Sequence, residues 1–324
     1  MNTTTVIIIV LVVIAVLLLL DFLLGLVFFK IALGPKRRED PKVPCKNSLF
    51  ERNADNINLI NGYKWFDETP HEEILIPSHE KGKRLHAQFF KNDGDKWAIV
   101  IHGWTNINRE MSSYAMEYYN RGYNVIIPDL RGHGNSETDW VSMGWLDRLE
   151  IVDWANYIVS ICPNAQIVLH GVSMGAATTM MATGEKLPEN VICAVEDCGF
   201  SSVYQIFEDQ SRDKYHIPPA ISMPAASFVN RIFNGFSFKE ASSIEQLKKS
   251  KTPTLFMHGD KDDFVKFENL DKVYDACTAE KEKYVIKGAE HAVSSHWFHE
   301  EYWNRVDEFL NKHVKAETAD VHNA

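Results

Sequence analysis

Cysteine is scarce in this chain. Its 324 residues include only five cysteines, an odd number, and no two of them form a C-x-x-C motif. Such a set is not a disulfide framework, so we expect reduced thiols in a buried core. The five are Cys45, Cys162, Cys193, Cys198 and Cys277.

Basic residues are also few. The 34 lysines and arginines are outnumbered by 44 aspartates and glutamates, which gives a formal net charge of -10, and no stretch supplies a basic face. We therefore expect no nucleic-acid partner, because binding a phosphate backbone requires such a face. The sequence has no internal repeat, and its 45% of apolar residues favour one large domain after the N-terminal segment.

A metal-binding motif is missing as well. His296 and His299 have an i, i+3 spacing at the start of the last predicted helix, but no H-E-x-x-H motif and no third ligand accompany them. We interpret this pair as surface or packing residues of the helix. The sequence gives no reason to expect a metal or an organic cofactor.

One long apolar run is present, at residues 6–29, and Asp21 is its one charged residue. About 24 residues at 1.5 Å each reach roughly 36 Å, enough to cross a hydrocarbon core of about 30 Å. The carboxylate costs about 3 kcal/mol, but the apolar side chains contribute about -6 kcal/mol, so insertion is still favoured. Residues 1–5 carry no basic residue and no A-x-A site follows, so we predict an uncleaved transmembrane anchor at 1–33 rather than a signal peptide.

The basic residues nearest to this anchor set its expected orientation. No lysine or arginine precedes the apolar run, whereas Lys30, Lys36, Arg37 and Arg38 lie at its C-terminal end or just beyond it. The positive-inside rule then leaves the C-terminal bulk in the cytoplasm. We predict a single-pass protein of the cell membrane with a cytoplasmic catalytic domain. A membrane-impermeant thiol reagent should therefore leave Cys45 unlabelled on intact cells.

The rest of the chain divides into a linker, one large domain and a tail. Residues 34–61 are expected to form a juxtamembrane linker and residues 316–324 a polar tail. Within residues 62–315 short apolar segments alternate with amphipathic ones, a pattern typical of a mostly parallel sheet with helices on both faces. The eight predicted strands are 73–76, 85–90, 97–102, 124–128, 166–170, 192–196, 254–258 and 283–286. The predicted helices are 111–121, 145–161, 174–185, 270–277 and 297–313.

Residues 201–250 interrupt this alternation. They contain no clear strand and are rich in phenylalanine and proline. We interpret them as a small helical cap over the C-terminal edge of the sheet, where ligands bind in open α/β sheets. The alternative is an ordinary surface excursion with its own small core.

The most informative motif is Gly171-Val172-Ser173-Met174-Gly175, which lies between a predicted strand and a predicted helix. A sharp strand-to-helix turn at this point would raise the Ser173 hydroxyl above the sheet, where a histidine can take its proton. The flanking glycines have a steric reason, because a side chain at either position would collide with the neighbouring strand or helix. We therefore predict that Ser173 is a nucleophile.

A nucleophilic serine needs a base, and in a turn of this kind the acid and then the histidine follow the serine along the chain. Five histidines lie late enough. His291 stands out because it lies in a loop directly after the last predicted strand, within Gly288-Ala289-Glu290-His291. We predict that His291 is the base.

Three carboxylates compete for the role of the orienting acid in the loop after residues 254–258. We favour Asp262, since Asp260 and Asp263 suit turn caps or solvent-facing positions. Asp197, which follows the strand predicted at 192–196, is a rival at the end of an earlier strand.

The oxyanion hole should use two backbone amides, those of Met174 and Trp104. Met174 follows the nucleophile, and Trp104 follows the strand end at His102-Gly103. The glycine lets the chain turn the Trp104 amide toward the anion. We expect the His102 side chain itself to be a structural residue at the end of the strand.

Taken together, the segments HGW, DLRGHGNSE, HGVSMG, EDCGFSS, HGDKDDFV and GAEH resemble the α/β-hydrolase superfamily over residues 62–314. More narrowly they resemble its monoacylglycerol lipase and serine aminopeptidase-like branch, including membrane-anchored members from Gram-positive bacteria. The resemblance implies the α/β-hydrolase fold, with Ser173 as nucleophile, Asp262 as acid, His291 as base and the amides of Trp104 and Met174 as the oxyanion hole. The cap sequence varies with substrate in such families, so it identifies none.

These observations predict a serine hydrolase that acts on carboxylic esters or thioesters through an acyl-enzyme. The anchor and the aromatic cap favour a small-molecule acyl substrate taken from or near the membrane. Peptides, amides and acyl transfer remain alternatives, because the same triad supports them. A non-enzymatic alternative is a ligand-binding module on the same scaffold.

Overall fold

The computed structural model describes residues 2–36 and 53–315. The predictions for Arg37, Arg38, Cys45 and the tail at 316–324 concern residues outside this part. Eight strands form one sheet in the order β1-β2-β4-β3-β5-β6-β7-β8. Their bounds are β1 Glu72–Pro77, β2 Arg84–Phe90, β3 Lys96–Ile101, β4 Asn124–Pro128, β5 Gln166–Val172, β6 Val191–Asp197, β7 Thr254–Gly259 and β8 Lys281–Ile286.

The sheet is mostly parallel. β1 and β2 pair antiparallel with each other and β2 pairs antiparallel with β4, whereas every pair from β4 through β3, β5, β6 and β7 to β8 is parallel. All eight predicted strands are confirmed. The observed ends differ from the predicted ones by no more than two residues. The hydrophobic pattern and the turn residues identify a strand, but they do not fix its terminal residues.

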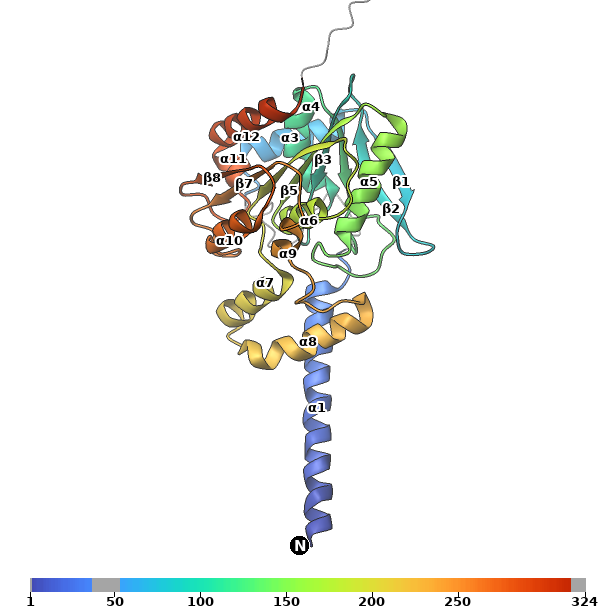
Figure 1. Cartoon of the computed structure of the whole chain (residues 1–324), viewed down its shortest axis with the longest axis vertical. Coiled ribbons are helices and arrows are strands. Elements are labelled where there is room, and N and C mark those ends of the chain that lie inside the picture. The colour runs from blue at the N-terminus through green and yellow to red at the C-terminus, as the bar shows by residue number, and fades with distance from the viewer. Residues whose placement is uncertain (1, 37–52, 316–324) are drawn as a thin grey trace, which may run out of the picture.

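Helices cover both faces of the sheet, as predicted (Figure 1). The central strands are buried on both sides: in β3, Ile99 and Ile101 belong to one core, and Ala98 and Val100 belong to the other. This explains the continuous apolar runs in the sequence, since alternate side chains of a strand point to opposite faces. Within residues 53–315 and outside the cap, the helices are α3 Ile57–Glu68, η1 Asn108–Met111, α4 Ser112–Asn120, α5 Asp147–Ile161, α6 Met174–Thr183, α10 Glu268–Ala276, α11 Ser294–Trp297 and α12 His299–His313.

A helical cap is inserted between β6 and β7, where the sequence predicts one. It comprises α7 (Val203–Asp209), one turn of π-helix (η2, Gln210–Lys214), α8 (Pro219–Asn234) and α9 (Ser243–Leu247). Pro219 lies at the first position of α8, and Gly235, in a left-handed conformation with φ 78°, ends it.

The N-terminal apolar segment forms one helix, α1 (Thr3–Leu33), long and apolar enough to cross a membrane. Its N-terminal part stands free of the domain, but its last turns pack against the cap helix α8 (Figure 1). Phe29 and Leu33 are buried in the main core, and the Phe29 ring also stacks on the partly exposed Phe233 of α8 at 5.0 Å. Gly25 permits the crossing, since a Cβ there would lie 2.8 Å from the Ala225 carbonyl carbon. The helix is therefore both a candidate membrane span and a part of the folded domain.

The domain boundary predicted between residues 61 and 62 falls inside α3. Asn56 caps this helix by accepting hydrogen bonds from the amides of Asn58 and Leu59. Gly62 packs so tightly on α4 that a Cβ would lie 2.5 Å from the Ser113 nitrogen. The whole of α3 therefore packs onto the sheet domain. The sequence before it is charged and contains proline, which is typical of a linker, so sequence reasoning did not place the start of the domain at this helix.

Candidate active site

The turn between β5 and α6 has the geometry that its glycines predict. Ser173, between the last residue of β5 and the first of α6, has φ 58° and ψ -116°, a strained backbone for a non-glycine residue. A Cβ on Gly171 would lie 2.1 Å from the Gly175 carbonyl oxygen, and one on Gly175 would lie 2.0 Å from the Ile101 oxygen. Both contacts are impossible, so the steric reason for the glycines is confirmed.

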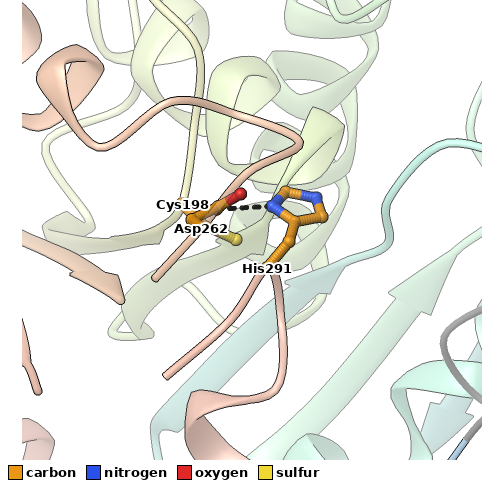
Figure 2. A group of neighbouring side chains, drawn as sticks. All are labelled: Cys198, Asp262 and His291. Atoms are coloured by element: carbon orange, nitrogen blue, oxygen red, sulfur yellow. Dashed lines mark hydrogen bonds and ion pairs between the residues drawn. The ribbon is translucent and has the colours of Figure 1, made fainter. Parts of the chain in front are cut away.

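Ser173, His291 and Asp262 come together at the C-terminal edge of the sheet. The Ser173 hydroxyl lies 2.8 Å from His291 Nε2. His291 Nδ1 lies 2.7 Å from Asp262 Oδ2, the bond drawn in Figure 2. All three side chains are buried. With Nδ1 protonated, the imidazole donates to Asp262 and its Nε2 accepts from the serine, the arrangement that nucleophilic catalysis requires.

The Asp262 carboxylate has donors on both oxygens. Oδ1 accepts from the amides of Phe264 and Val265, at 3.0 and 2.8 Å. Oδ2 lies 3.1 Å from His258 Nε2 as well as close to His291. Burial alone raises the pKa of Asp262, but the charge of His291 and the hydrogen bonds from both histidines lower it to about 2. The acid is therefore ionised over the physiological range.

Sequence reasoning overlooked His258 as a neighbour of the acid. It lies in β7, four residues before Asp262, and its Nε2 also lies 2.9 Å from the Val265 carbonyl oxygen. Burial lowers its pKa, but the hydrogen bond to Asp262 and the charge of Asp262 raise it above the ordinary value. The signal was present, since the histidine belongs to the same H-G-D-K-D segment.

The other candidate acids have different surroundings. Asp260 accepts a hydrogen bond from the Gly288 amide at 2.6 Å, and Asp263 is exposed. Asp197 is buried at the end of β6, and its main-chain oxygen accepts a bond from the Ser173 amide at 2.8 Å. Burial raises the pKa of the Asp197 carboxyl to about 6. Of the four carboxylates, Asp262 is the one bonded to His291.

The Cys198 thiol lies beside Asp262 and His291 (Figure 2), and the three ligand atoms are close enough to hold a metal ion. Their chemistry does not suit one. Both His291 ring nitrogens already bond to Ser173 and Asp262. Burial and the neighbouring Asp197 raise the pKa of Cys198 well above its ordinary value, so the thiol stays protonated, and a protonated thiol is a poor ligand.

The two late histidines with metal-like spacing have separate partners. His296 Nε2 lies 3.0 Å from the Ser113 hydroxyl, and burial lowers the pKa of this imidazole to about 3. His299 Nε2 lies 3.0 Å from Glu117 Oε1. Both side chains are accounted for by packing contacts with α4.

The loop after β3 carries Trp104 to the edge of the site. A Cβ on Gly103 would lie 3.4 Å from the Ser173 Cβ, so this loop runs directly beside the nucleophile. Met174 begins α6, so its amide has no carbonyl four residues earlier in the helix to bind. Both predicted oxyanion-hole residues thus line the site around Ser173.

Sequence reasoning did not indicate what the Trp104 side chain does. Its indole Nε1 donates a 2.8 Å hydrogen bond to the Ala32 carbonyl of α1, and the Lys36 ammonium lies 5.1 Å from the ring centroid. The same residue therefore joins the loop beside the nucleophile to the N-terminal helix.

Two cavities meet at Ser173. One, of about 200 Å³, is mostly apolar and is lined by the cap, by Met174 and by α1 residues such as Val27 and Phe28. The other, of about 700 Å³, is much more polar than the first and contains His291 and charged side chains of the cap and of the Asp262 loop. Trp104, Ser173 and Phe264 border both. A carbonyl carbon at Ser173 would thus have an apolar space on one side and a polar space on the other.

Residues 110–317, more than half of the chain, match the prolyl oligopeptidase family. The chain belongs to this family. It is 26% identical over 293 residues to the uncharacterized protein YqkD of Bacillus subtilis. The aligned region covers 89% of this chain and 92% of YqkD. It is 23% identical over 225 residues to the bifunctional esterase/perhydrolase DCH of Acinetobacter calcoaceticus, which covers 56% of this chain and 80% of that enzyme.

Among solved structures, the fold is similar to that of the Pyrococcus furiosus esterase Pf2001. The TM-score is 0.63 at 22% identity, and the match covers 78% of this chain and 96% of the esterase. The α/β-hydrolase fold is confirmed. The chain is a member of an esterase- and peptidase-like α/β-hydrolase family, which agrees with the predicted superfamily.

Proposed function

We propose that this protein is a membrane-anchored serine hydrolase that cleaves carboxylic esters, or thioesters, of an apolar acyl group. One observation carries the proposal: the hydroxyl of a strained turn serine, Ser173, bonds to an imidazole that bonds to a carboxylate, at the junction of an apolar and a polar cavity. The triad members are Ser173, His291 and Asp262.

The first half of the reaction forms an acyl-enzyme. Ser173 Oγ attacks the carbonyl carbon while His291 Nε2 takes the hydroxyl proton, and Asp262 stabilises the imidazolium that results. The carbonyl oxygen becomes an oxyanion, which the amides of Trp104 and Met174 bind. Collapse of this intermediate breaks the bond to the leaving group, which takes the proton from His291 and departs as an alcohol or thiol.

Water completes the cycle from the polar cavity, which contains His291. His291 takes a proton from the water as its oxygen attacks the acyl carbon, and the second oxyanion occupies the same two amides. Its collapse returns the proton to Ser173 and releases the carboxylic acid. The chain's own residues suffice for every step, so the proposal invokes no cofactor.

The apolar cavity favours esters over peptides as substrates. Its lining includes Phe28, Phe200 and Phe207, which suit an acyl chain better than a peptide backbone with its many polar groups. This supports the monoacylglycerol lipase-like branch. The prolyl oligopeptidase family match keeps peptide and amide cleavage, or acyl transfer, as the alternative.

The proposed location of the protein rests on α1. We propose a single-pass anchor in the cell membrane with the catalytic domain in the cytoplasm, supported by the length of α1 and by the basic residues at its C-terminal end. A membrane-impermeant maleimide should leave Cys45 unlabelled on intact cells and label it after permeabilisation. Strong labelling of intact cells would reverse the orientation.

A fluorophosphonate probe tests the chemistry on the full-length protein. The wild type should be labelled, and Ser173→Ala should not. Ser294→Ala is a matched control, because Ser294 is also buried but lies outside the site in α11. A binding module on this scaffold would show no activity-dependent label at all.

A panel of p-nitrophenyl esters, acyl-CoA thioesters and peptide p-nitroanilides then ranks the reactions. We expect kcat/KM to be highest for an ester or thioester. A higher value for the anilides would establish the peptidase alternative, and new esters formed with added alcohols would indicate acyl transfer.

A further inference from the structure

We propose that α1 is part of the substrate site, and that the substrate is an acyl lipid of the bilayer that enters between α1 and the cap while α8 lies on the membrane surface. This inference rests on the proposed function and names its substrate class. It goes beyond anchoring, because it gives the membrane helix a role in binding and selecting the acyl chain.

The length of α1 places the cap at the membrane. Every residue from 3 to 20 is exposed, and burial by the domain begins at Asp21 and Phe22. About 18 free residues at 1.5 Å each reach roughly 27 Å, close to the hydrocarbon thickness of about 30 Å. The exposed part of α1 is no longer than the hydrocarbon core, so none of it remains as a spacer between the bilayer and the domain. A bilayer that holds this segment must therefore touch the cap.

Helix α8 has the surface that such a contact requires. It crosses α1 (Figure 1) and exposes large apolar side chains at Ile221, Phe228 and Ile232, at half or more of their area. These positions are spaced by seven and four residues, so they share one face of the helix. The helix has no acidic residue and carries Arg231 among them. An apolar face with a basic residue suits a membrane interface.

The apolar cavity runs from the nucleophile toward the same surface. Ala32 and Ile31 of α1 line it beside Trp104 and Ser173, and Leu24 lines it farther along the helix. Leu24 precedes Ala32 by eight positions, which is about 12 Å of the helix axis in the direction of the free, apolar half of α1. An acyl chain in this cavity therefore extends toward the bilayer that the chain comes from.

The polar cavity on the other side of Ser173 suits the remainder of a lipid. Its lining includes Asp213 and Lys266, whose charged atoms lie 2.6 Å apart, and also Lys214, Asp263 and Glu290. Neutral polar groups such as glycerol hydroxyls can bond to both signs of charge. The leaving group is thus a polar headgroup or glycerol, while the tail lies along α1.

A bulky substitution on α1 tests the lining. In full-length protein reconstituted in phosphatidylcholine vesicles, Val27→Trp should lower the ratio of kcat/KM for dodecanoyl over butanoyl esters by at least about tenfold, because the indole fills space meant for methylenes. Misfolding would lower both rates together and leave this ratio unmoved. Leu23→Trp is the matched control, since Leu23 is similarly exposed on α1 but does not line the cavity. An unchanged ratio in a Val27→Trp protein that retains the wild-type kcat/KM for butanoyl esters would overturn the proposal that α1 lines the acyl site.

Photo-cross-linking tests the membrane contact without any need for activity. Benzoylphenylalanine placed at Phe228 should form adducts with phospholipid acyl chains in vesicles, detected by mass spectrometry. The same amino acid at Leu75, an exposed position in β1, should form none. Absence of adducts at position 228 would show that α8 does not lie on the bilayer, and would overturn the proposed contact between the cap and the membrane.

The proposed hydrolase function and the proposed role of α1 in the substrate site would fail in different ways. If the wild type is not labelled by fluorophosphonate and cleaves no ester, the proposed function is wrong, whatever the cross-links show. If the wild type is active but Val27→Trp behaves like Leu23→Trp, the hydrolase stands and α1 is an anchor alone.

Discussion

The indole Nε1 of Trp104 donates a 2.8 Å hydrogen bond to the main-chain oxygen of Ala32. Ala32 lies in the last turn of α1, where carbonyl groups have no partner within the helix. The amide of the same tryptophan is the proposed oxyanion donor. The position of the N-terminal helix is thereby coupled to the position of the proposed oxyanion donor.

Removing this bond should slow the reaction without removing the amide. We expect Trp104→Phe to lower kcat/KM for a long-chain ester about fivefold, because a net hydrogen bond is worth about 1 kcal/mol. Trp297→Phe is the control: Trp297 Nε1 donates a comparable bond to Asn53 at 2.7 Å, and Trp297 lines neither cavity. Equal losses in the two variants would show that the coupling to α1 does not matter.

The assignment of the acid gives a second prediction. Asp262→Asn should lower kcat by about 10⁴-fold, because an amide cannot hold the His291 tautomer that accepts the serine proton. Asp197→Asn should lower kcat less than about tenfold, since its carboxylate is not bonded to His291. Steady-state kinetics of both variants decides whether Asp262 or Asp197 is the acid. A larger loss of kcat in Asp197→Asn would identify Asp197, at the end of β6, as the acid.

The pairing of His258 with Asp262 gives a third prediction, on stability against pH. The pKa of Asp262 is lowered to about 2, so its contribution is present above the unfolded value of about 4 and is lost as the pH falls toward 2. The pKa of His258 is raised, so its contribution is present below about 6.5 and is lost as the pH rises through the folded value.

The contributions of Asp262 and His258 to the free energy of unfolding are both present between about pH 4 and 6.5. The free energy of unfolding should therefore differ most between wild type and His258→Gln in this window, and the gap should narrow on both sides. Denaturant unfolding from pH 3 to pH 9 measures it. His79→Gln, which removes an exposed partner of Asp153, should produce a gap of at most about 1 kcal/mol. A gap that is constant with pH in His258→Gln would contradict the coupling.

The turn at Ser173 gives a fourth prediction. In Gly175→Ala the new methyl group would overlap the Ile101 oxygen, and relief costs about 3 kcal/mol or more, which lowers Tm by at least about 5 °C. The shift should also abolish fluorophosphonate labelling. Gly82→Ala controls for backbone strain alone, because that glycine has φ 79° but no atom within 4 Å of the Cβ position. A fully labelled Gly175→Ala would show that the turn is not constrained as described.

Local patterns predicted most of the fold and the site. The strands were found because buried parallel strands are short apolar runs, and the order of Ser173, Asp262 and His291 followed from a serine turn whose two glycines have one steric purpose. Asp262 was separated from Asp260 and Asp263 by its position in the loop, and the hydrogen bond to His291 agrees with that choice.

Contacts between distant segments could not be predicted in this way. The packing of Phe29 and Leu33 into the main core, and the bond between Ala32 and Trp104, join residues about seventy or more positions apart. An apolar helix facing a cap has the same composition as one facing lipid, so hydropathy does not distinguish them. The length of the apolar run was the available sign, because its 24 residues exceed the roughly 20 that a bilayer requires.

The acyl-enzyme itself tests the central claim most directly. Full-length protein in vesicles is mixed with a long-chain p-nitrophenyl ester, quenched in acid within the first turnover and digested for mass spectrometry. The account predicts that the acyl group is found on the peptide containing Ser173 in the wild type, and is absent in His291→Ala. An acyl group on another residue, or full turnover in a variant that lacks the Ser173 hydroxyl, would contradict it.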